Sequence, residues 1–348
     1  MTYHSVFRNT KFMNFIAPLL SLSLCLPLLG QAVFTTPEGY TKIPIAAGTA
    51  GGPTLTAISA TLLNGLEHSS GATVVANFAT NEQDVTVTGA TWTANQWTGV
   101  PYLAYLTNTS GSEEAFLIAS HTADTLTLST TFDFLSATRF PASTTVTIRK
   151  ASTVNSILGA PSTPFTTNDR VFIWEDGTWV TLATFGGNWA YFSGPNLGDS
   201  ATDAVIFPEE GIFVQRAELT AAELTLFGEV PSAPQASTVA GASSYFVSTR
   251  FPVGDTPTVN PTGMRLQDLN IHDIPGWSTS DRAYFWDGAQ WITLAAFGSN
   301  WAYFSGPNVG NSANDLVIPA NSALFLTRAS VGTESASPLN VPLPYTVE

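Results

Sequence analysis

The sequence predicts an all-β protein made of modular antiparallel β-sandwich or barrel units, and three observations support this fold class. Short runs alternate small polar with branched apolar residues, which gives a strand one buried and one solvent-facing side; examples are residues 73–76, 84–88, 125–129 and 145–148. The 27 Gly and 22 Pro divide the chain by frequent turns. A long motif also recurs at a constant offset of 112 residues, which indicates a duplicated folding unit.

Residues 1–32 have the pattern of a cleaved signal peptide. Arg8 and Lys11 precede an apolar stretch over residues 12–29, and Gly30-Gln31-Ala32 supplies the small residues that a signal peptidase recognises. Cleavage near Ala32 would make the mature chain a secreted, periplasmic or cell-surface protein.

Two alternatives exist for this segment. An uncleaved membrane anchor is disfavoured because Pro18 and Pro27 interrupt the apolar stretch. A lipoprotein signal at Cys25 is disfavoured because Leu24 stands where a small residue is needed. Cys25 is the single cysteine of the chain, so cleavage would leave a mature protein without disulfides or thiol chemistry.

The predicted signal is followed by an N-terminal β module over residues 33–150 that contains an inserted strand-rich segment. Within it, residues 102–107 and 115–119 are predicted to form a hairpin around a polar turn. Outside this module, the Glu-, Leu- and Ala-rich stretch 217–227 predicts the single short helix.

The duplication organises the rest of the chain. Residues 169–194 and 281–306 are identical at sixteen of 26 positions, and the match continues without a gap to Arg216 and Arg328. We therefore expect β repeat unit 1 over residues 151–235, β repeat unit 2 over 236–335 and a C-terminal tail over 336–348.

Each unit is predicted to contain the same hairpins. Two strands meet at a turn flanked by Trp174 and Trp179 in the first copy, and by Trp286 and Trp291 in the second. Asp-Gly lies one residue earlier in the second turn than in the first, so turn geometry rather than one Asp side chain is retained.

This order of motifs resembles a family of secreted β-repeat proteins from Verrucomicrobia and related bacteria. The resemblance rests on the Trp hairpin, the Gly-x-Asn-Trp turn, an Asp followed by Val-Ile, and the closing segments 206–216 and 318–328. Residues 91–128 are similar to the family's inserted strand module. The family's closing glycine is present as Gly211 but is replaced by Ala323 in the second copy. The family has no assigned activity, so the resemblance implies export and repeat architecture only.

The repeated aromatic residues are the first candidate ligand-binding set. Exposed indoles stack on sugar rings, and neighbouring amides can bind sugar hydroxyls. The alternative is that these side chains form the core of each unit, since aromatics on paired strands are commonly buried. The candidate residues are Trp179, Asn188, Trp189, Tyr191, Trp291, Asn300, Trp301 and Tyr303.

Calcium is a second candidate ligand, because oxygen-rich loops with glycine follow the repeated Trp strands. The candidate ligands are Asp199, Asp203 and Asp315. However, Asp199 becomes Asn311 in the second copy, and no EF-hand spacing is present. Turn-capping roles for these residues are the alternative, and no metal or other cofactor is predicted as part of the protein.

Composition excludes some functions and weakens others. A formal net charge of −14 disfavours nucleic acid and anionic lipid as partners. The mature histidines, His68, His121 and His272, are isolated in the sequence, and no nucleophile or phosphate-loop motif occurs. The acidic residues Glu113-Glu114, Glu209-Glu210 and Asp176 are the candidates for a glycosidase pair, but the sequence does not fix their separation.

We therefore expect an exported, non-catalytic structural or cell-surface interaction protein. The first alternative is a carbohydrate-binding protein that uses the repeated Trp residues, and the second is a secreted glycan-active enzyme. The expected partners are extracellular polysaccharide or other surface proteins, with no nucleic acid and no membrane span in the mature chain.

Overall fold

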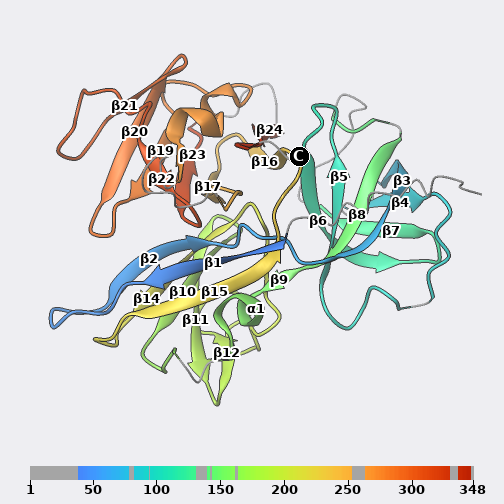
Figure 1. Cartoon of the computed structure of the whole chain (residues 1–348), viewed down its shortest axis with the longest axis horizontal. Coiled ribbons are helices and arrows are strands. Elements are labelled where there is room, and N and C mark those ends of the chain that lie inside the picture. The colour runs from blue at the N-terminus through green and yellow to red at the C-terminus, as the bar shows by residue number, and fades with distance from the viewer. Residues whose placement is uncertain are drawn as a thin grey trace, which may run out of the picture. The chain divides into compact units, whose positions relative to one another are not determined.

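The computed structural model describes residues 38–77, 82–93, 95–130, 139–141, 143–160, 164–252, 263–329 and 336–345. Almost all of its regular elements are strands, so the all-β class is confirmed (Figure 1). The predicted signal segment 1–32, including Cys25, lies outside the described residues. None of the helices in the described ranges has the length and apolar character of a membrane-spanning helix.

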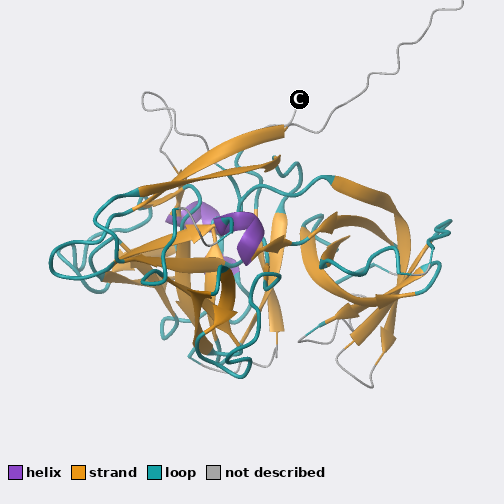
Figure 2. Ribbon diagram, turned by 90° about the horizontal axis from the view of Figure 1, so that it is seen from below, coloured by secondary structure: helices purple, strands orange, loops and turns teal. Residues whose placement is uncertain are grey.

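Six strands close into an antiparallel barrel, visible as a ring in Figure 2. Its strand order is β6-β5-β8-β3-β4-β7, and a pairing between β6 and β7 closes the circle. Alternate side chains such as Leu126, Leu128, Val146 and Ile148 fill the interior, as the alternating sequence pattern predicts. The strands are β3 (Leu66–Asn77), β4 (Glu82–Val87), β5 (Tyr102–Thr107), β6 (Glu113–His121), β7 (Thr125–Ser129) and β8 (Thr144–Lys150). The predicted hairpin is formed by β5 and β6.

The barrel is inserted into the first repeat, so that part of this repeat precedes the barrel in the sequence and the rest follows it. Its five-stranded sheet has the order β12-β11-β10-β14-β2, and a separate ribbon of β1 and β15 covers one face. The elements before the barrel are β1 (Glu38–Ile45) and β2 (Thr54–Ser59). Those after it are β9 (Ser152–Thr153), α1 (Val154–Leu158), β10 (Arg170–Glu175), β11 (Thr178–Phe185), β12 (Asn188–Tyr191), β13 (Val205–Ile206), β14 (Gly211–Arg216) and β15 (Ala222–Glu229).

The second repeat has the same topology in one uninterrupted segment. Its five-stranded sheet has the order β21-β20-β19-β23-β17, and the ribbon of β16 and β24 takes the place of β1 and β15. The elements are β16 (Gln235–Ala240), β17 (Ser244–Ser248), β18 (Gly263–Arg265), the 3-10 helices η1 (Leu266–Leu269) and η2 (Ile271–Asp273), β19 (Arg282–Trp286), β20 (Trp291–Phe297), β21 (Asn300–Tyr303), β22 (Val317–Pro319), β23 (Ala323–Thr327) and β24 (Ala336–Val341).

These pairings shift the domain boundaries expected from the sequence. The first repeat begins at β1 and β2, which the sequence assigned to the module 33–150, and the barrel is inserted between β2 and β9. The second repeat includes β24, which lies in the predicted tail 336–348. We name residues 38–59 and 152–229 the first repeat, 66–150 the barrel and 235–341 the second repeat.

The helix predicted at 217–227 is wrong. The segment contains most of β15, which pairs with β1 over eight residues. Leu224 and Leu226 alternate toward the core of the first repeat. Tertiary pairing therefore outweighs the helical propensity of the Ala, Glu and Leu residues.

The two repeats pack against each other through equivalent aromatic contacts. The Nε1 atom of Trp174 donates to the Ser244 carbonyl at 2.8 Å, and Nε1 of Trp286 donates to the Leu55 carbonyl at 3.1 Å. Leu55 and Ser244 occupy the same register position in β2 and β17. Each repeat thus offers the other the same surface, as in a two-fold symmetric dimer.

A buried acid closes each repeat at the start of β10 or β19. Asp169 accepts hydrogen bonds from the backbone nitrogens of Thr166 (2.9 Å) and Ala217 (2.8 Å) and lies 3.4 Å from Arg216. Asp281 accepts the equivalent bonds from Ser278 and Ala329, both at 2.6 Å. These two acids are fully buried and act mainly as caps for backbone nitrogens.

Candidate functional site

The structure divides the repeated aromatic candidates into core and interface residues. Trp189 and Trp301 are 0% and 1% exposed, and Nε1 of Trp189 donates to the Gly159 carbonyl at 2.9 Å. Trp179 and Trp291 are 36% and 38% exposed, but their rings contact Phe325 and Phe213 of the opposite repeat at 5.8 and 5.5 Å. Trp189 and Trp301 therefore belong to the two cores, whereas Trp179 and Trp291 are partly exposed and pack at the interface between the repeats.

The remaining aromatic-set candidates are spread over the outer strands. Tyr191 and Tyr303 are half-buried against the two cores. Asn188 and Asn300 are exposed at the hairpin ends, where Asn300 accepts a hydrogen bond from Asn314 at 3.3 Å. The structure does not bring these residues together in one site.

The calcium candidates are all exposed loop residues. Asp315 lies 3.5 Å from Arg265, which pairs more closely with Asp268. Within the described ranges, no group of three or more His, Cys, Asp or Glu side chains is arranged to hold a metal ion. Asp199 and Asp203 belong to the loop between β12 and β13.

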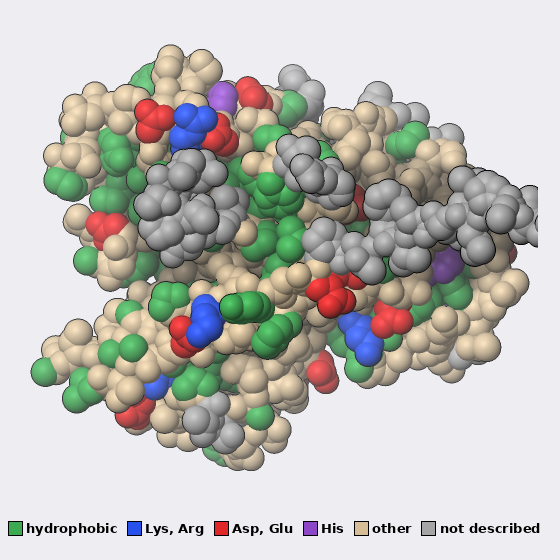
Figure 3. Space-filling model, in the orientation of Figure 1, with side chains coloured by type: hydrophobic (Ala, Val, Ile, Leu, Met, Phe, Trp, Pro, Cys, Tyr) green, Lys and Arg blue, Asp and Glu red, His purple; other side chains and the backbone are tan. Residues whose placement is uncertain are grey.

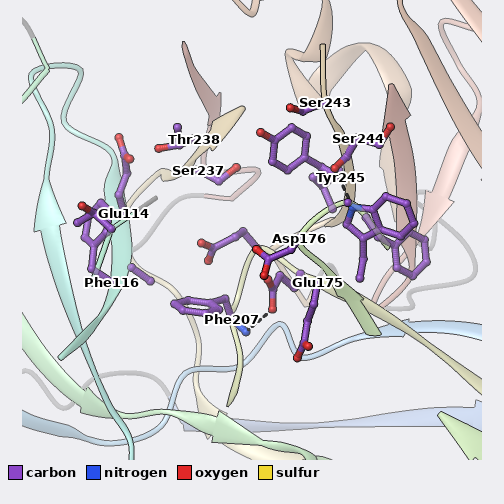
Figure 4. A pocket seen from close by; sticks show the side chains of 18 of the residues that line it. Glu114, Phe116, Glu175, Asp176, Phe207, Ser237, Thr238, Ser243, Ser244 and Tyr245 are labelled. Carbon is purple, nitrogen blue, oxygen red and sulfur yellow. Dashed lines mark hydrogen bonds between the residues drawn. The ribbon is translucent and has the colours of Figure 1, made fainter. Parts of the chain in front are cut away.

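A pocket of about 810 Å³ lies where the barrel, the first repeat and the second repeat meet. Figure 4 shows Glu114 and Phe116 of β6 on one side and Ser244 and Tyr245 of β17 on the other. Its volume lies in the range of small-molecule sites. The polar lining residues are Glu114, Ser129, Thr130, Arg139, Glu175, Asp176, Glu209, Glu210, Ser237, Thr238, Ser243, Ser244 and Tyr245, and the aromatic ones are Phe116, Trp174, Phe207 and Phe246.

Two neighbouring acids of the pocket have strongly raised pKa values. Burial, opposed by the charge of the Arg250 guanidinium, raises the pKa of Glu209 to about 7. Burial and the adjacent Glu209 raise the pKa of Glu210 to about 8. Burial and Asp176 also raise the pKa of Glu175. Near neutral pH these carboxyl groups therefore supply both hydrogen-bond donors and acceptors.

Hydrogen bonds hold the carboxylates of Glu210 and Glu114 and the backbone of Glu209. Glu210 accepts a hydrogen bond from the Phe207 nitrogen at 3.0 Å, and its own nitrogen donates to the Phe207 carbonyl at 2.9 Å. The Glu209 carbonyl accepts from the Ser248 nitrogen at 2.8 Å, which ties this turn to the second repeat. Glu114, only 1% exposed, is bound by Arg139 and by Asn108.

The second repeat builds the equivalent turn without acids. The equivalent turn of the second repeat carries Asn321 and Ser322, and there the Asn321 carbonyl accepts from the Ser59 nitrogen at 2.7 Å. Asn321 also donates to Thr41 at 2.7 Å. The same turn is therefore built with neutral residues in one copy and with two acids in the copy that borders the pocket.

The sequence listed Glu114, Asp176, Glu209 and Glu210 as acids but could not place them in one pocket. A comparison of the two copies contains a signal for two of them, because Glu209 and Glu210 stand where the second copy has Asn321 and Ser322. Tyr245, Ser237 and Thr238 had no such signal. Ser237 and Thr238 lie on β16, which pairs in parallel with β6 of the barrel, and Tyr245 lies on β17.

The comparisons with known proteins add no relative. No protein-family model matches the chain, and neither a curated protein nor a solved structure is similar to it.

Proposed function

We propose that the chain is an exported, non-catalytic interaction protein that binds a short neutral saccharide in the pocket between the barrel and the two repeats. The observation that supports this proposal is the lining of the pocket, which combines hydroxyl groups, carboxyl groups of raised pKa and four aromatic rings. A sugar presents many hydroxyls and apolar C–H faces, so it needs donors, acceptors and ring surfaces close together. The signal-like segment 1–32 supports export, and extracellular polysaccharide is the proposed source of the ligand.

The charge of the pocket restricts the ligand. Five acids line it, and Arg139, its basic lining residue, is held by Glu114. A sugar that carries carboxylate groups would be repelled, whereas a neutral sugar would not. The hydroxyl of Tyr245 accepts the Ala240 amide at 2.8 Å and keeps its own proton available to a ligand.

Calorimetric titration with a panel of neutral oligosaccharides tests this proposal. We expect one saturable site and a loss of affinity of about tenfold in Glu209→Gln, since one charge-assisted hydrogen bond would be weakened. Phe207→Ala should also weaken binding because it removes an aromatic wall. Asp287→Asn, at the position of the second repeat equivalent to pocket residue Glu175, is the matched control and should bind normally. Unchanged affinity in both pocket variants would contradict the proposal.

A glycan-active enzyme is the second candidate, favoured by one observation. Glycosidases use one protonated and one ionised carboxyl group, and the pocket holds Glu210 with a raised pKa beside other acids. Incubation with the same oligosaccharides and measurement of new reducing ends separates the two functions. We expect no product; hydrolysis that disappears in Glu210→Gln would establish the enzyme instead.

A further inference from the structure

Two arginine side chains differ from the other arginines in the described part of this acidic protein. Arg139, Arg149, Arg216 and Arg265 each lie within 4 Å of a carboxylate, and two further arginines are buried. Arg170 and Arg282 are half-exposed, and no acidic side chain lies within salt-bridge distance of either among the described residues. They occupy equivalent positions at the start of β10 and β19. Figure 3 shows how sparse charged side chains are on one face of the molecule.

Both guanidinium groups are held in the same orientation by backbone oxygens. Nη1 of Arg170 donates to the carbonyls of Thr167 and Asp169 at 2.6 and 2.8 Å. Nη1 of Arg282 donates to those of Thr279 and Asp281 at 2.6 and 2.7 Å. Within the described structure, Nε and Nη2 of both residues have no protein acceptor. These two nitrogens form the side of a guanidinium that binds a carboxylate with two parallel hydrogen bonds.

Each of these arginines lies over an exposed aromatic ring. The guanidinium carbon of Arg170 is 5.0 Å from the ring centre of Phe192, and that of Arg282 is 4.4 Å from the ring centre of Phe304. The two Phe side chains are 60% and 53% exposed. An exposed Phe is not required for the fold, yet both copies keep it although their sequences differ at ten of the 26 compared positions.

We infer that the two Arg–Phe pairs, Arg170 with Phe192 and Arg282 with Phe304, are twin binding sites for an acidic polysaccharide built from uronic acid rings. The free edge of the guanidinium binds the ring carboxylate, and the Phe ring contacts the C–H face of the same or the next sugar. Two equal sites on one chain suit a polymer that repeats its epitope, because binding at one site raises the local concentration at the other. This inference concerns a different surface and a different ligand charge from the neutral-sugar pocket.

The net charge of the protein opposes the binding of an acidic polymer everywhere except at local basic sites. With a formal net charge of −14, the chain repels an acidic polymer as a whole. Binding therefore depends on the two guanidinium groups that no protein acid neutralises. A short uronate oligosaccharide should bind weakly at each site, and a long polymer should bind more tightly through both.

Counting the uronate-binding sites on the chain tests this inference. In calorimetric or NMR titration with a short oligogalacturonate, we expect two equivalent sites on the native chain, one in Arg170→Gln, one in Arg282→Gln and none in the double variant. A neutral oligosaccharide of the same length should not bind at these sites. Immobilised polygalacturonate should retain the native chain at least about tenfold more tightly than either single variant, because the second contact is lost.

Two further measurements keep the test independent of folding and of the pocket. Phe192→Ala leaves the Arg170 backbone bonds in place and should lose the same site, with thermal unfolding as the check of structure. Glu209→Gln should retain both sites, so failure of the pocket proposal is distinguishable from failure here. Binding that persists in the double arginine variant, or equal binding of poly-glutamate, would overturn the inference.

Discussion

Gly211 and Ala323 occupy equivalent positions in the two repeats but do not tolerate the same side chain. A Cβ atom at Gly211 would lie 2.2 Å from Cβ of Ala323 and 3.0 Å from the ring of Phe246. The sequence indicated a turn glycine that the second copy lacks. The structure gives a different reason: the two positions meet across the repeat interface, which has room for one methyl group.

This contact predicts the effect of exchanging the two residues. Gly211→Ala should lower the free energy of unfolding by about 1–3 kcal/mol, because a second methyl group overfills a packed interface. The double variant Gly211→Ala with Ala323→Gly should recover much of this loss, since one methyl group is again present. Urea unfolding measures all three proteins, and an unaffected Gly211→Ala chain would contradict the contact.

The raised pKa of Glu210 predicts how the stability of the folded chain depends on pH. Its pKa is about 8 in the folded chain against the ordinary glutamate value of 4.5, so the folded state binds more protons than the unfolded state between these values. Stability should therefore fall as pH rises from about 4.5 to about 8 and then level off. In Glu210→Gln the melting temperature should fall less steeply over this range. Melting curves between pH 5 and pH 9 check this, and an unchanged slope would argue against the buried carboxyl.

At the scale of single elements, the alternating sequence pattern was sufficient to predict strands that bury one face in a nearby core. The runs at 84–88, 125–129 and 145–148 are found within or overlapping β4, β7 and β8, because alternation fixes which side chains enter the barrel. The pattern failed at β15, whose Ala and Glu residues favour a helix in isolation. Its partner β1 lies far earlier in the chain, so no local signal could reveal the pairing.

The strands β10 and β19 carry two equivalent hydrogen bonds between the repeats, and these bonds predict a matched pair of variants. Trp286→Phe removes the donor to the Leu55 carbonyl and should cost about 1 kcal/mol of stability beyond the loss of ring area. Trp174→Phe removes the equivalent donor to Ser244 and should cost a similar amount. Urea unfolding of both variants is the check. A large loss in one and none in the other would contradict the two-fold arrangement.

At the scale of the whole molecule, the duplication was visible in the sequence but its full extent was not. The densest run of identical positions spans β10–β12 and β19–β21, where Trp189 and Trp301 need the same core in both copies. The ribbons β1–β15 and β16–β24 have diverged in sequence, and the barrel separates β2 from the rest of its sheet. Only the pairing of distant strands shows that the first repeat begins at Glu38.

The same three-dimensional assembly explains why the pocket could not be predicted. Its walls come from β6 of the barrel, the turn before β14 and strand β17, which are remote in sequence. The parallel pairing of Gln235 with Glu113 joins the barrel to the second repeat next to Glu209 and Glu210. Burial raises the pKa values of Glu209 and Glu210, and residues from all three parts line the pocket beside them.

The proposed saccharide site is tested most directly by following the side-chain carboxyl carbons of Glu209 and Glu210 by NMR during titration with a neutral oligosaccharide. We expect both signals to shift saturably with one binding constant, and we expect the apparent pKa values of the two carboxyl groups to change in the complex. Binding that leaves both signals unmoved, with shifts confined to other regions of the molecule, would contradict it.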